Sequence, residues 1–186
     1  MCYRNTIYTS NAKTSRNDNS SRFGKFIRIH FTSSGKLAGC DIESYLLEKS
    51  RITQLQEVER SYHIFYQLLQ PFVPDLKPKC QLTDDIYDYQ FVSQGKVKVE
   101  SIDDNEELEY TDSAFDIIGF SQEEKWSCYK LTAAVMSMGQ VASKQKGRDE
   151  QAAEFNVVLG PSQQYMLTLT MANVPGGDRD PRALDR

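Results

Sequence analysis

The sequence predicts an α/β fold in which a β-hairpin is followed mainly by α-helices. The first observation is a β-branched and aromatic run, Phe26–Phe31, then a turn at Thr32–Lys36 and a second apolar-rich run, Leu37–Leu47. Two such runs around a short polar turn are typical of a hairpin. The second observation is that apolar residues recur at helical spacing in later stretches, which open with a hydroxyl residue followed three positions later by an acid.

The segments around the hairpin strands are polar. Residues 1–24 are rich in Asn, Ser, Thr and Arg, and we interpret them as loop. The first strand of the hairpin alternates imperfectly between apolar and polar residues, which predicts a strand covered on both faces.

A helix is predicted over Glu57–Gln70, because Tyr62, Phe65, Tyr66 and Leu69 stand at i, i+3, i+4 and i+7. The proline that follows ends it. We interpret this aromatic stripe as a core face rather than as a cofactor site.

Two further helices are predicted after short extended segments over Ile86–Val99 around Gly95. Ser101 with Asp104 matches the spacing of a capping box and predicts the first helix start. That helix is expected to be interrupted near Thr111. Its first turns carry a run of acids, which we interpret as a solvated face near a helix N-terminus rather than as catalytic groups. These acids are Asp103, Asp104, Glu106, Glu107 and Glu109.

Gly119 is suited to end the first of these helices, and Ser121 with Glu124 predicts the start of the second. The second helix carries one apolar face, formed by Trp126, Tyr129, Ala133 and Met136. A short strand is predicted over Tyr165–Ala172, before a polar end. The sequence contains no internal repeat.

Composition argues against several classes of protein. Hydrophobic residues make up 39% and charged residues 26% of the 186 residues, which is the balance of a soluble globular protein. A net charge of −4 disfavours nucleic-acid binding, which needs a basic face. No stretch predicts a membrane span or a secretory signal, so we expect an intracellular protein. Scattered cysteines and histidines predict neither a disulfide frame nor a metal held by side chains alone.

The stretch that carries chemistry is Asn17–Lys25, which combines Asn, Ser, Arg and Gly. Phosphate and Mg²⁺ are hard partners that prefer hydroxyls, amides and backbone N–H groups, and Arg22 adds a fixed positive fork. Gly24 permits a close approach of the backbone. From the residues alone, an ordinary Asx/Ser turn with a surface arginine is the simpler interpretation, and a phosphate loop is the alternative.

A resemblance favours the second interpretation. The run from Asn11 to Phe26, with its pattern NxNSSRFGK, resembles switch I of the myosins, and Lys144–Ala152 resembles the muscle-type branch, class II. Other stretches agree with the family in order and spacing. They are Asp41–Glu43, Tyr45–Lys49, Glu59–Gln67, Val92–Gly95, Ser101–Asp104 and Phe115–Phe120.

The resemblance implies part of a P-loop NTPase-type motor: the switch I loop, a hairpin of the central sheet, then mainly helices. It implies MgATP as the cofactor, with the Ser21 hydroxyl on Mg²⁺, Asn17 on the phosphates and Ser20 orienting the attacking water. Arg22 would pair with a glutamate of switch II. Ser20 and Arg22 would be the catalytic residues in this scheme.

The resemblance also sets the expected organisation and partners. Residues 1–10 are a divergent N-terminus, residues 11–152 a partial motor domain, and residues 153–186 a divergent tail. Partners would be actin filaments and the remainder of the heavy chain, in the cytoplasm, at the cytoskeleton or a muscle thick filament. Neither nucleic acid nor membrane is expected.

Two motifs that the family uses are missing from the sequence. A phosphate loop of the form G-x-x-x-x-G-K-[ST] and the switch II pattern Asp-x-x-Gly-Phe-Glu are both absent. Arg22 is therefore expected to have no partner within the chain, and the chain by itself is expected to hydrolyse no ATP. The alternatives are a non-catalytic binding or dominant-negative segment, or a truncated product without function. A hairpin without its neighbours would expose an edge and an apolar face.

Overall fold

The computed structural model describes residues 10–140, 142–145 and 153–156. Contacts divide the chain into two compact units, Met1–Gly139 and Gln140–Arg186. In the second unit, β5 (Ala142–Gln145) pairs antiparallel with β6 (Ala153–Asn156). The strand predicted over Tyr165–Ala172 lies outside the described residues.

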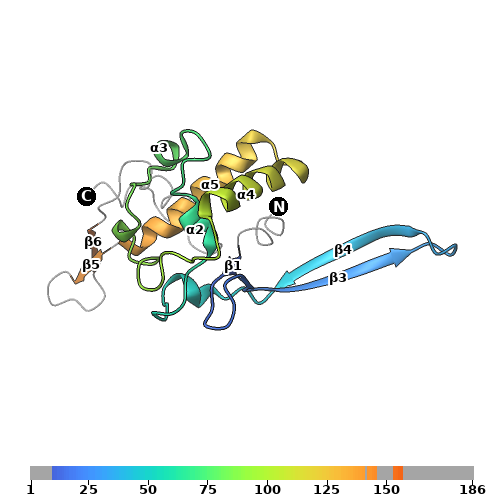
Figure 1. Cartoon of the computed structure of the whole chain (residues 1–186), viewed down its shortest axis with the longest axis horizontal. Coiled ribbons are helices and arrows are strands. Elements are labelled where there is room, and N and C mark those ends of the chain that lie inside the picture. Colours follow the sequence, from blue (N-terminus) through green and yellow to red (C-terminus); the bar gives the residue numbers. More distant parts are fainter. Residues whose placement is uncertain (1–9, 141, 146–152, 157–186) are drawn as a thin grey trace. The chain divides into compact units, whose positions relative to one another are not determined.

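The predicted hairpin is confirmed. Strand β3 (Gly24–Phe31) pairs antiparallel with β4 (Leu37–Tyr45), and the two form the long ribbon in Figure 1. In this register Ile27 lies opposite Ile42, and Arg28 lies opposite Asp41. No third strand joins the pair within the described residues.

The prediction of cover on both faces of the hairpin is wrong for this chain. Cross-strand partners share a face, so Ile27, Ile29 and Ile42 form an apolar face, and each of them remains about half exposed. On the other face, Arg28 lies near the carboxylates of Asp41 and Glu43 on β4. His30 Nε2 lies 2.7 Å from Oδ2 of Asp41. The hairpin therefore has one face with a row of isoleucines and one face that carries the charged pairs together with Phe26.

The loop before the hairpin contains a small ladder that the sequence did not predict. Strand β1 (Asn11–Ala12) pairs antiparallel with β2 (Ser20–Ser21), and Ala12 also forms a bridge with Tyr62. Ala12 is fully buried. This second bridge attaches the loop to the helical core.

The helix predicted over Glu57–Gln70 is much shorter, because α2 spans only His63–Gln67. The residues before α2 form backbone hydrogen bonds with other segments instead of a helix. The Arg60 N–H donates to the Lys13 carbonyl at 3.1 Å, and the Glu59 carbonyl accepts from the Lys96 N–H at 2.8 Å. The aromatic stripe is nevertheless buried as predicted.

The extended segments predicted over Ile86–Val99 are also wrong. The structure has a 3-10 helix η2 (Ile86–Asp88) and then turns. Gly95 explains the difference, because a Cβ there would meet the Glu59 carbonyl oxygen at 2.2 Å. The segment is therefore shaped by a close backbone approach rather than by strand pairing.

Short helices that were not predicted complete the connections. Helix α3 (Leu76–Cys80) tolerates Pro78 because that residue lies in the first turn, where N–H groups have no intrahelical partner. The 3-10 helices η1 (Lys49–Ile52) and η3 (Met138–Gln140) follow β4 and α5.

Helix α4 (Asp104–Ile117) is continuous, so the expected interruption near Thr111 is wrong. The Thr111 side chain instead joins α4 to α2, because its hydroxyl donates to Gln67 Oε1 at 3.2 Å. The predicted cap is also wrong. Asp103, rather than Ser101, caps the helix by accepting from the backbone of the next turn. Gly119 ends α4 as predicted, with a φ of 80°.

Helix α5 (Gln122–Ser137) begins with the predicted capping box of Ser121 and Glu124. Its Lys125 side chain lies between Asp112, at 2.8 Å, and Asp116, at 3.1 Å, on α4.

Helix α2 packs against both α4 and α5. Apolar side chains of these elements form two core clusters. Buried members of the first are Ala12, Tyr62, Ile64, Phe65, Tyr66, Leu69, Tyr89, Val92 and Met136; those of the second are Leu68, Leu76, Cys80, Leu108, Phe115, Tyr129 and Ala133.

The two observed caps lead to a test of the helix starts. Asp103→Ala and Ser121→Ala should each lower the free energy of unfolding by about 1 kcal/mol, because each leaves first-turn N–H groups without an acceptor. Urea denaturation followed by the fluorescence of Trp126 measures this. Ser113→Ala, at an exposed position inside α4, is the matched control and should change little. An Asp103→Ala variant as stable as the parent chain would contradict the cap assignment.

Candidate functional site

The loop of residues 11–22, which we call the serine loop, is held in shape by its own polar groups. The Asn17 carbonyl accepts from the Thr14 N–H at 2.8 Å, and Asn17 Oδ1 accepts from the Asn19 N–H at 2.9 Å. Lys13 and Asp18 form an ion pair across the loop. Asn17 itself is exposed, and its amide nitrogen is the end that faces away from this internal contact.

The two serines of β2 point to opposite sides, as successive residues of a strand do. The Ser20 hydroxyl lies 3.2 Å from the Thr14 hydroxyl, inside the loop. Ser21, which pairs with Asn11 through the backbone, is exposed. The outward hydroxyl of the pair is therefore that of Ser21.

Arg22 has a partner within the chain, so the expectation that it has none is wrong. Its Nε donates to Glu48 Oε2 at 2.6 Å, and the Glu48 N–H donates to the Arg22 carbonyl at 3.0 Å. Glu48 also binds the buried Arg51, whose Nε lies 2.7 Å from the same oxygen. Glu48 thus fixes Arg22 through both its backbone and its side chain.

The electrostatics of this cluster favour the ionised carboxylate. Partial burial opposes ionisation of Glu48, but hydrogen bonds from Arg22 and Arg51 outweigh it and place the pKa of Glu48 below its ordinary value. Arg51 also pairs with Glu59, at 3.2 Å. Since two carboxylates share two guanidinium groups, the charges of the cluster balance.

One acid of the predicted solvated run is not solvated. Asp104 binds Arg60, which is fully buried and donates to Oδ1 at 2.9 Å and also to Oδ2. The Arg60 guanidinium lies over the Tyr66 ring, 3.7 Å from its centroid. The prediction of a solvated face is thus wrong at Asp104, because this carboxylate pairs with the buried guanidinium of Arg60.

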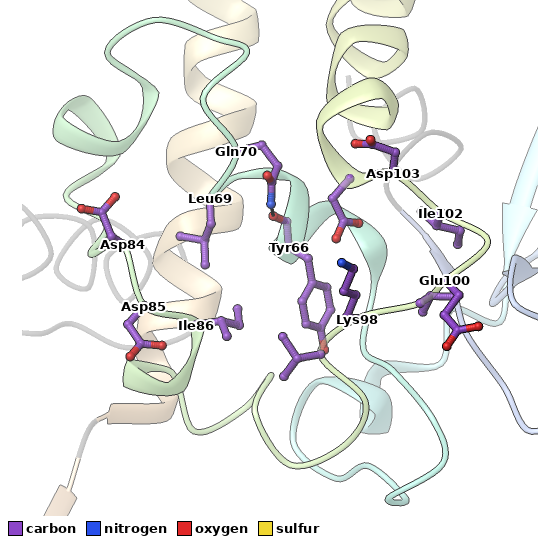
Figure 2. Close-up of a pocket in the computed structure, with 13 residues that line it drawn as sticks. Tyr66, Leu69, Gln70, Asp84, Asp85, Ile86, Lys98, Glu100, Ile102 and Asp103 are labelled. Carbon is purple, nitrogen blue, oxygen red and sulfur yellow. Dashed lines mark hydrogen bonds between the residues drawn. The ribbon is translucent and has the colours of Figure 1, made fainter.

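A cavity of about 710 Å³ lies beside this ion pair, and no residue of the serine loop lines it. Figure 2 shows Asp84 and Asp85 on one side of it and Glu100 and Asp103 on the other, with Lys98 between them. Its wall is therefore mainly negative. Such a wall repels phosphate, so the cavity and the phosphate chemistry of the loop are separate.

The donor set of the serine loop suits a phosphate with a hard cation. An outward hydroxyl at Ser21, an amide at Asn17 and a guanidinium at Arg22 lie within six consecutive residues. Hydroxyl oxygens are ligands that Mg²⁺ accepts, and amide and guanidinium N–H groups are donors for phosphate oxygens. Within the described residues, side chains form no cluster of three or more groups that could hold a metal.

In the structure, a loop of polar donors leads directly into a β-hairpin, and a helical core follows. A family model described as the myosin head (motor domain) matches residues 8–171, which is most of the chain. The chain belongs to the myosin head family. Heads of this family are actin-based motors that in general use a nucleotide with Mg²⁺. In the part of the chain that the structure describes, no helix could cross a membrane.

Several residues of the site were missed by the sequence reasoning. Glu48 and Arg60 gave no local signal, because their partners are 26 and 44 residues away. His63 was considered only among the scattered histidines, and Asp18 only as part of the stretch Asn17–Lys25. Both prove to contact each other, through His63 Nε2 and the Asp18 carbonyl at 3.0 Å.

Proposed function

We propose that residues 11–25 form the phosphate-sensing loop of an MgATP site in an actin-based motor. The observation that supports this most directly is that the loop has two different sides. Arg22, Asp18 and Ala12 tie one side to the rest of the unit, whereas Asn17 and Ser21 on the other side remain exposed. Such a loop can hold polar donors in place before a ligand arrives, which lowers the cost of binding.

Each residue of the loop has a proposed role. The Ser21 hydroxyl would be a ligand of Mg²⁺, and the Asn17 amide would donate to phosphate oxygens. Ser20, held by Thr14, would orient the attacking water. When bound, MgATP supplies the transferable phosphoryl group and the divalent charge. Arg22, fixed by Glu48, would place its guanidinium beside the site. A glutamate of a second switch segment would then share this guanidinium with Glu48.

The proposal extends to the setting of the chain. Actin filaments and the remainder of a myosin heavy chain would be its partners, in the cytoplasm at the cytoskeleton. The stretch Lys144–Ala152 supports the muscle-type branch, class II, and thereby the thick filament as the location. A non-catalytic binding segment is the second candidate, and the exposed apolar face of the hairpin favours it.

A titration with MgATP tests the proposal. We expect saturable changes in the amide NMR signals of Asn17, Ser21 and Arg22. Arg22→Gln should weaken the apparent affinity by about tenfold or more, because hydrogen bonds to charged groups contribute about 1.5–3 kcal/mol. Arg28→Gln is the matched control: it removes the same charge from the hairpin and should leave the affinity within about twofold.

Two outcomes would contradict the proposal. Signals of the serine loop that stay unchanged at saturating MgATP would exclude a phosphate contact by this loop and favour the binding-segment alternative. Equal weakening by Arg22→Gln and Arg28→Gln would show that only the net charge of the chain is sensed.

A further inference from the structure

Asp18 is contacted from three directions by separate segments of the chain. Lys13 pairs with one carboxylate oxygen, and the Ser101 hydroxyl donates to the other at 2.6 Å. The carbonyl of the same residue lies 3.0 Å from His63 Nε2. A single residue of the serine loop thus meets α2 and the residues that lead into α4.

The contacts of His63 determine which tautomer it adopts. A carbonyl only accepts hydrogen bonds, so Nε2 must carry the proton that it donates to Asp18. On the other side of the ring, Arg60 Nη1 lies 3.3 Å from His63 Nδ1, and a guanidinium only donates. Nδ1 must therefore present its lone pair, and His63 is the neutral Nε2–H form. Burial, and next the charge of Arg60, lower the pKa of His63 to about 4, in agreement with this form.

These contacts close on themselves. Arg60 binds Asp104 with two nitrogens, and Asp104 is the first residue of α4. Three residues before it, Ser101 donates back to Asp18. The side-chain contacts of Asp18, His63, Arg60, Asp104 and Ser101 therefore form a circuit, which the backbone between Ser101 and Asp104 closes. We call it the polar ring.

Two members of the ring are buried, so the loss of either leaves a polar group of the interior with fewer partners. Arg60 is fully buried and His63 is 6% exposed. The Nε of Arg60 has no hydrogen-bond partner within the described residues, so this buried guanidinium already carries one unpaired donor. Unpaired polar groups in a low-dielectric interior are costly, so the contacts are expected to form and break together.

We infer that Asp18 and His63 are positioning residues, and that the polar ring makes the serine loop and the first turn of α4 move as one unit. A displacement of the loop is transmitted through His63 and Arg60 to Asp104, and directly through Ser101. The ring itself does not depend on the proposed function. One consequence does rest on the proposed function: a phosphate bound by the loop would shift the first turn of α4.

Amide hydrogen exchange of the full chain without nucleotide tests the inference. His63→Leu should speed exchange about tenfold or more both in residues 17–22 and in residues 105–107, because it removes the donor and the acceptor together. His63→Gln carries one donor and one acceptor and should retain most of the protection. Ser101→Ala changes an exposed side chain, so it tests the same coupling without a core substitution, and both segments should again lose protection together.

Ser121→Ala is the matched control, since it frees the start of α5 and should leave the serine loop unchanged. Nitrogen-15 NMR of the His63 ring at pH 7 should show the proton on Nε2, which a purely space-filling role would not require. A proton on Nδ1, or faster exchange in the loop with α4 unaffected, would overturn the inference. Because nucleotide is absent from these measurements, their outcome is independent of the MgATP titration.

Discussion

Replacing Arg60 with methionine is expected to lower the free energy of unfolding by about 3–5 kcal/mol, the range for removing one partner of a buried ion pair. Arg60 is fully buried, binds both oxygens of Asp104 and covers the Tyr66 ring. Methionine fills much of the volume but leaves the Asp104 carboxylate, itself only 15% exposed, without its cation. Urea denaturation followed by Trp126 fluorescence measures the loss.

Two further variants separate the buried charge from the lost packing. Arg60→Met combined with Asp104→Leu removes both charges, so most of the lost stability should return. Arg28→Met removes an arginine whose ion pairs on the hairpin are more than half exposed, and it should change stability by less than about 1 kcal/mol. Equal effects of Arg60→Met and Arg28→Met would show that Arg60 is not an anchor of the fold.

Stability should also depend on the protonation of His63. The pKa of this side chain is lowered from 6.5 to about 4, by burial first and by the charge of Arg60 second. Besides Arg60, the charged groups that act on it are Asp104 and Asp18, which favour protonation more weakly. Between pH 6.5 and 4 the unfolded chain takes up a proton that the folded chain excludes, so stability falls as pH falls.

The expected size of this loss is about 3 kcal/mol, since each unit of pKa difference corresponds to about 1.4 kcal/mol. The contribution is complete above pH 6.5 and gone below pH 4. Denaturation curves of the parent chain and of His63→Gln at pH 7, 5.5 and 4 isolate it, because the variant lacks the titrating ring. A constant difference in stability between the two chains across this range would refute the assignment.

The parts of the fold that the sequence predicted are those with local causes. The hairpin follows from β-branched residues around a polar turn, and the capping box of Ser121 and Glu124 and the end of α4 at Gly119 depend on neighbours within a few residues. The errors have non-local causes. Residues 57–62 match a helical pattern, yet their backbone groups pair with Lys13 and Lys96 instead.

The candidate site divides in the same way. The serine loop was recognised from its own residue types and from the resemblance to switch I, and the roles of Ser20 and Ser21 stay predictions. Its supports could not be recognised, since Glu48, His63 and Ser101 come from three segments that only the tertiary structure brings to the loop. Ser101 illustrates the difficulty: its spacing to Asp104 suggested a cap, whereas its hydroxyl binds a residue 83 positions earlier.

The two-stranded hairpin with its exposed isoleucine face would change shape if another element packed against it. Two-stranded ribbons twist more strongly than wide sheets, so a neighbour that docked on the apolar face or extended either edge would flatten β3 and β4. Strand β3 starts at Gly24, two residues after Arg22, so the strain of flattening would be delivered at the base of the serine loop. A layer added to the hairpin would therefore act on the backbone next to Arg22, whose side chain is held by Glu48.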